Sequence, residues 1–209
     1  MNTDNLKDIG EQLRNHLLAK HRAREEAIIL SRDIVRHSAN AIRAVHRRDF
    51  PQAEALIAQA RDGLQKAQGA LADHRDILYA GFLHDGAKEY VEASCTLALI
   101  AGRPLPAPES LGVEAPAYLN GLAEAIGELR RHLLDSLREG DIDHCEQTLA
   151  AMGDIYDVLQ TMDFPEGVTS GLRHTTDAMR AILERTRGDF TTAYVQHRLE
   201  QRLRTLGGE

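Results

Sequence analysis

Two pairs of glutamates are the residues of this sequence best suited to chemistry. Glu89 and Glu92 stand three apart in the stretch KEYVEA, and Glu124 and Glu128 stand four apart in YLNGLAEAIGELRRHLLDSL. Helical residues at these spacings lie about 5–6 Å apart at Cβ, and carboxylates that close repel each other unless a cation or a shared proton intervenes. Hard divalent metals take such oxygen ligands. The four glutamates could therefore hold one or two Mg²⁺ or Mn²⁺ ions, which activate water for phosphodiester hydrolysis.

The surroundings of the two pairs leave other interpretations open. Glu89 and Glu92 share one helical sector, about 60° wide, with Asp85 and Thr96, and apolar residues bracket that sector. The second pair lies opposite the apolar stripe of its helix, a pattern that also fits two simply exposed glutamates. A di-iron site would need Glu-x-x-His motifs, and the sequence contains none.

A row of arginines is the second candidate functional feature. It consists of Arg32, Arg36, Arg43 and Arg47. On a helix these residues fall within a sector about 60° wide, roughly opposite the apolar stripe, and His46 lies near its far end. Because guanidinium groups suit phosphate, the row could follow a nucleic-acid backbone. The alternative is a solvated face with ion pairs inside the helix.

The composition narrows the class of protein. Of 209 residues, 43% are hydrophobic and only 4% aromatic, and the net charge is −7. A general nucleic-acid binder would be basic, so a polyanion would need a local basic patch or metal held by carboxylates. Neither a signal core nor an apolar run of about 20 residues is present, so we expect a cytoplasmic protein without membrane association.

Helix formers dominate the sequence, and turn signals divide it into about seven helices. They are predicted near residues 5–48, 51–72, 74–101, 116–139, 141–162, 165–188 and 189–206. Asp49 and either Asp141 or Asp143 are the expected N-caps. Short connections predict an all-α antiparallel bundle, and the whole chain, residues 1–209, is expected to form a single domain.

The same motifs resemble the translin and Trax family. The similarity covers LSRDIVRHSANAIRAVHR, the stretch KEYVEA, and YLNGLAEAIGELRRHLLDSLREGDID followed by IYD at residues 155–157. The resemblance implies a translin-like helical fold over roughly residues 20–190. Trax carboxylates fall on Glu89, Glu92, Glu124 and Glu128, although the family pattern has Asp at Glu124. The complete set makes the chain similar to Trax rather than to translin, in a compact prokaryotic form.

The resemblance also implies a function. It suggests a metal-dependent endoribonuclease, using Mg²⁺ or Mn²⁺, that acts on single-stranded RNA and could also take single-stranded DNA. Eukaryotic translin and Trax form a closed hetero-octameric shell, so a homo-oligomeric, octamer-like shell is expected here. A non-catalytic, translin-like binder of single-stranded RNA or DNA is the alternative. A purely structural helical oligomer is the third interpretation.

Overall fold

The computed structural model describes residues 3–207, and within that range the chain forms helices and no strands. The long helices are α1 (Leu6–His46), α2 (Phe50–Ala70), α4 (Phe82–Ile100), α6 (Ala115–Glu139), α7 (Ile142–Gln160) and α9 (Leu172–Gly207). Single turns form α3 (Arg75–Leu78), α5 (Pro108–Leu111) and α8 (Glu166–Thr169). The predicted all-α bundle is confirmed. The predicted domain, 1–209, extends beyond the described residues by positions 1–2 and 208–209.

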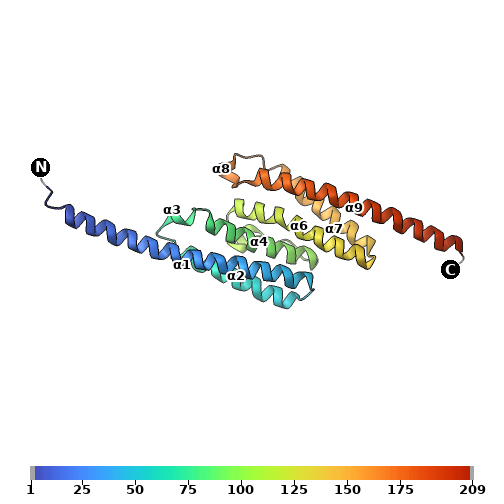
Figure 1. Ribbon diagram of the computed structural model, residues 1–209, viewed down its shortest axis with the longest axis horizontal. Coiled ribbons are helices and arrows are strands. Elements are labelled where there is room, and N and C mark those ends of the chain that lie inside the picture. The colour runs from blue at the N-terminus through green and yellow to red at the C-terminus, as the bar shows by residue number, and fades with distance from the viewer. Residues whose placement is uncertain (1–2, 208–209) are drawn as a thin grey trace.

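The long helices run roughly along one axis and pack as two groups of three (Figure 1). Helices α1, α2 and α4 pack together on one side, and α6, α7 and α9 on the other. The two groups meet where α4 packs against α6. The first turns of α1 and the last turns of α9 project from opposite ends of the bundle (Figure 1).

Capping side chains set two of the helix starts that the sequence predicts. The Asp49 carboxylate accepts a hydrogen bond from the Gln52 amide at 3.2 Å, and the Asp141 carboxylate accepts one from the His144 amide at 3.1 Å. Each satisfies an amide that has no partner within its own helix. Asp141, rather than Asp143, is therefore the cap of α7.

The predicted third helix, near residues 74–101, is wrong as a single element. The chain breaks between α3 and α4, where Gly81 has φ = 91°. This left-handed conformation costs a glycine little, and it lets α4 start in a new direction.

The predicted helices 165–188 and 189–206 are also wrong, because α9 continues through Gly188. A glycine inside a helix costs only about 1 kcal/mol. Arg130 of α6 stabilises the helix on both sides of the glycine, donating to Thr186 at 2.9 Å and to Asp189 at 2.7 Å. These contacts favour a continuous helix over the predicted break.

Close approach of α4 and α6 depends on Gly121. A Cβ atom at this position would lie 2.5 Å from the Lys88 carbonyl oxygen and 2.7 Å from Cβ of Val91. Gly127, on the same helix, has no such neighbour within 4 Å of a Cβ built on it. Only Gly121, of these two, brings the helices together.

Among the described residues, no helix is both long enough and apolar enough to cross a membrane.

Candidate metal centre

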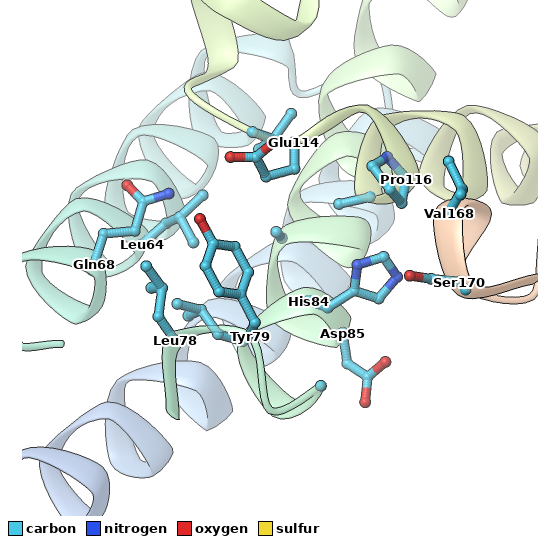
Figure 2. A pocket seen from close by; sticks show the side chains of 16 residues that line it. Leu64, Gln68, Leu78, Tyr79, His84, Asp85, Glu114, Pro116, Val168 and Ser170 are labelled. Atoms are coloured by element: carbon cyan, nitrogen blue, oxygen red, sulfur yellow. The ribbon is translucent and has the colours of Figure 1, made fainter. Parts of the chain in front are cut away.

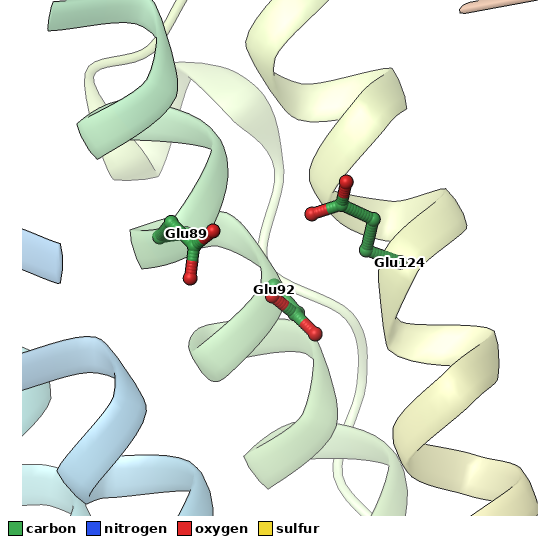
Figure 3. Close-up of side chains that lie close together, drawn as sticks. All are labelled: Glu89, Glu92 and Glu124. Atoms are coloured by element: carbon green, nitrogen blue, oxygen red, sulfur yellow. The ribbon is translucent and has the colours of Figure 1, made fainter. Parts of the chain in front are cut away.

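Three of the predicted carboxylates converge between α4 and α6. Glu89 and Glu92 project from α4, and Glu124 reaches toward them from α6 (Figure 3). Each contributes an oxygen atom, and these oxygens lie within 4.8 Å of one another. All three residues are partly buried. We call these three residues the carboxylate cluster.

Electrostatics within the carboxylate cluster are unfavourable to full ionisation. Burial, together with the charges of Glu89, Glu124 and Glu128, raises the pKa of Glu92 to about 8. Burial also raises the pKa of Glu89, with a smaller contribution from the charge of Glu124 and an opposing one from Lys88. In the absence of a bound cation, Glu92 therefore carries a proton through most of the neutral range.

Lys88 provides a positive charge at one side of the carboxylate cluster. Its Nζ atom donates to Oε1 of Glu124 at 2.8 Å and lies 3.8 Å from Oε1 of Glu89. Burial alone would lower the pKa of Lys88, but its hydrogen bond to Glu124 and the nearby carboxylate charges raise it overall. The amine is therefore a fixed cation at neutral pH.

Glu128 lies outside the carboxylate cluster and has a different partner. Its Oε2 atom is 2.5 Å from Nε2 of His46, at the end of α1, and 4.0 Å from Nη1 of Arg131. The His46 side chain is only 5% exposed. Sequence periodicity placed His46 with the exposed arginine row. That placement is wrong, because the imidazole is buried against the Glu128 side of α6.

The arginine row lies on the exposed face of α1. Arg32, Arg36, Arg43 and Arg47 are all exposed. Arg36 pairs with Asp33 at 2.9 Å, and Arg43 donates to the Asn40 side chain at 2.8 Å. These local contacts are typical of a solvated helix face. They still leave the guanidinium groups of the row accessible to a ligand in solvent. A nucleic-acid contact by the row remains a prediction.

A pocket of about 600 Å³ opens near the start of α4. Its wall includes the Tyr79 ring and the side chains of His84 and Asp85 (Figure 2). Asp85 precedes Glu89 by four residues, which is about one turn of α4. Burial lowers the pKa of His84, although the nearby charges of Asp85 and Glu124 act in the opposite direction. The pocket thus lies next to the carboxylate cluster along the same helix.

No family profile matches the sequence. The chain is 30% identical over 194 residues to an uncharacterized protein, MJ0175, of Methanocaldococcus jannaschii. The aligned region covers 92% of this chain and 86% of that relative. The fold of this chain matches the crystal structure of AfC3PO with a TM-score of 0.79 and 33% sequence identity, over 89% of this chain and 97% of AfC3PO. The chain belongs to the translin/Trax family as a Trax-like prokaryotic member.

Two further solved structures are similar to this chain. An AfC3PO complex with duplex RNA matches with a TM-score of 0.78 and 33% identity, over 89% of this chain and 96% of that chain. Apo-NeC3PO matches with a TM-score of 0.78 over 92% of this chain and 99% of that chain. Its identity is 20%, so this last match supports the fold alone.

The carboxylate cluster is chemically suited to the divalent metal that the family resemblance implies. Mg²⁺ and Mn²⁺ prefer carboxylate oxygens, with bond lengths of about 2.0–2.1 Å for Mg²⁺. Small rotations of the flexible glutamates would bring oxygens within 4.8 Å of one another onto one ion. Burial and, to a smaller extent, the neighbouring carboxylate charges disfavour the ionised form of Glu92, and a bound divalent ion would supply charge of the opposite sign.

Two residues at this site, Lys88 and His46, were not among the predicted functional residues. Lys88 belongs to the KEYVEA stretch itself, but helical periodicity places it on the face next to that of the carboxylates. The contact of His46 with Glu128 spans 82 residues of sequence. No local sequence pattern predicts a contact over this separation. The one available signal is the pair Glu124 and Glu128 opposite the apolar stripe, which is typical of acids that pair with a cation on a neighbouring helix.

Proposed function

We propose that this protein is a metal-dependent endoribonuclease whose carboxylate cluster holds Mg²⁺ or Mn²⁺. The observation that carries the proposal is the convergence of Glu89, Glu92 and Glu124 from two helices onto one small region. A bound divalent ion would lower the pKa of a water molecule and stabilise charge on a phosphodiester. The three glutamates would hold that ion, and Glu128, held by His46, would lie beside it.

The charge distribution indicates how a strand of nucleic acid would bind. The protein is acidic overall, so the exposed arginine row on α1 is the predicted contact for backbone phosphates. AfC3PO, at 33% identity, has been solved with duplex RNA. Single-stranded RNA is the proposed substrate here. Cleavage of a duplex RNA of matched sequence and of the matching single-stranded DNA would define the preference for strand type.

The projecting helix ends support assembly into a homo-oligomer. On α1 the apolar residues Leu6, Ile9, Leu13 and Leu17 repeat at helical spacing, and all are exposed. On α9, Val195, Leu199 and Leu203 do the same. Exposed apolar stripes of this kind are typical of protein–protein contacts. An octamer-like shell of this chain alone would enclose sites that are partly open in one subunit.

The test is cleavage of single-stranded RNA by the Glu124→Gln variant in Mn²⁺. Replacing a charged ligand with a neutral amide should reduce the rate by about 100-fold or more, on the scale of several kcal/mol that metal stabilisation provides. Glu139→Gln, at the exposed end of the same helix, is the matched control and should keep wild-type activity. Equal cleavage by Glu124→Gln and wild type would reject the proposed centre.

A non-catalytic binding protein is the second candidate, and one observation favours it. Lys88 donates to Glu124 at 2.8 Å, so a protein cation can neutralise part of the charge that a metal ion would otherwise balance. RNA binding by the wild type that does not depend on metal, together with no cleavage in Mg²⁺ or Mn²⁺, would establish this alternative.

A further inference from the structure

The ammonium group of Lys88 lies at one side of the carboxylate cluster, next to two of its glutamates. It is bound to Glu124 at 2.8 Å and lies 3.8 Å from Glu89, the two residues nearest to it in the carboxylate cluster. The Lys88 side chain is 21% exposed, and both glutamates are 28% exposed. Attraction between charges is stronger in such partly shielded positions than at an open surface. The ammonium is therefore held within the carboxylate cluster rather than moving freely in solvent.

The charges of the site suit a single divalent ion. Three ionised glutamates carry three negative charges, and Lys88 returns one positive charge, so one divalent ion completes neutralisation. The fourth carboxylate, Glu128, is already bound to His46. With Lys88 in place, a second divalent ion would leave a partly buried region with two excess positive charges, and burying unpaired charge is costly. Without Lys88 the excess falls to one, which the nearby charge of Glu128 can offset.

Lys88 also cannot serve as a metal ligand while it is protonated. An ammonium group has three donors and no lone pair. In two-metal sites the ions lie about 3.5–4 Å apart, bridged by carboxylates. A lysine bound to Glu124 and close to Glu89 occupies the part of the carboxylate cluster that a second ion would share.

We propose that Lys88 takes the place of a second metal ion, so that each subunit binds one divalent ion and keeps a fixed ammonium beside it. This inference rests on the proposed metal site, but it concerns ion number rather than cleavage. It narrows the one or two ions suggested by the sequence to one.

The test counts Mn²⁺ ions bound per chain by isothermal titration calorimetry on the full-length protein without RNA. The wild type should bind one ion per chain. Lys88→Met should bind two, with the first at least about tenfold tighter because a competing positive charge has been removed. Lys88→Arg should still bind one ion, and Lys66→Met, which removes an exposed lysine on α2, should match the wild type.

Lys88→Gln provides a second route if Lys88→Met does not fold, because glutamine keeps a donor for Glu124 without the charge. Two ions in the wild type, one ion in both the wild type and the neutral variants, or no bound ion at all would each overturn the proposal. One ion in the wild type and two in Lys88→Met, with no RNA cleaved, would reject the nuclease function and leave this inference standing.

Discussion

The carboxylate cluster and the arginine row are both lines of like charge on helices, but they sit in opposite environments. The glutamates of the carboxylate cluster are partly buried and come from two helices that touch. The arginines lie on one helix, all exposed, and two of them have local polar partners. Repulsion in the buried set is relieved by a proton and by Lys88, whereas water and neighbouring side chains relieve it in the exposed set. Convergence with burial, rather than charge alone, therefore distinguishes the proposed metal site from the predicted contact surface.

The first prediction concerns the partly buried carboxylate cluster and the pH dependence of its Mn²⁺ affinity. Because burial and neighbouring charges raise the pKa of Glu92 to about 8, Mn²⁺ must displace a proton to bind below that pH. We expect Mn²⁺ affinity to increase by on the order of 50-fold between pH 6 and pH 8, close to tenfold per unit at the lower end. Calorimetry in buffers of different ionisation enthalpy would measure both the affinity and the released proton. A flat profile would contradict the assigned role of Glu92.

The Glu92→Gln variant is the internal check on this prediction. It should bind Mn²⁺ weakly at every pH, with little pH dependence. Because burial and neighbouring charges hold the pKa of Glu92 in the folded protein above its ordinary value of 4.5, the stability of the metal-free wild type should decline as pH rises from about 5 through 8. The neutral glutamine should avoid this loss, and thermal melts at pH 8 should show a gain on the order of 2–3 kcal/mol in the free energy of unfolding. The two proteins should converge near pH 4.5.

The second prediction tests whether the exposed arginine row contacts RNA. Replacing all four arginines of the row with glutamine should lower affinity for single-stranded RNA by roughly 10- to 100-fold at 0.1 M salt, because counterion release is lost. The slope of log K against log salt should become shallower by about 3. Fluorescence anisotropy measures both quantities, and Mn²⁺ affinity should not change. An unaltered salt slope would remove the row from the binding surface.

The smallest expected effect tests the close contact between α4 and α6 at Gly121, which brings the carboxylate cluster together. Gly121→Ala would force α6 away from the Lys88 carbonyl oxygen. We expect a loss of about 1–3 kcal/mol in stability and about a tenfold loss in Mn²⁺ affinity, a factor equivalent to 1.4 kcal/mol. Gly127→Ala, on the same helix but with open space around it, should bind Mn²⁺ normally and gain up to about 1 kcal/mol in stability. Equal behaviour of the two variants would show that helix spacing does not set the site.

Much of this architecture could be predicted from the sequence, because it depends on local patterns. Capping by Asp49 and the facing of Glu89 and Glu92 both follow from residue spacing. The continuity of α9 could not be predicted, since it depends on Arg130 binding on both sides of Gly188 from another helix. The partners of Glu124 and Glu128 were missed for different reasons. Lys88 lies on a neighbouring face of α4, and His46 is distant in sequence and reaches its partner only through tertiary packing.

Three of the four glutamates at the site are already neutralised or paired in the metal-free molecule, and Glu89 lies 3.8 Å from the Lys88 ammonium. Glu92 holds a proton, Glu124 binds an ammonium and Glu128 binds an imidazole. This differs from small zinc domains, in which the metal supplies the free energy of folding. The chain can therefore fold first and take up its ion afterwards. With the proposed metal site, folding and metal loading should be separate events, and a chelator should empty the site while leaving the helices in place.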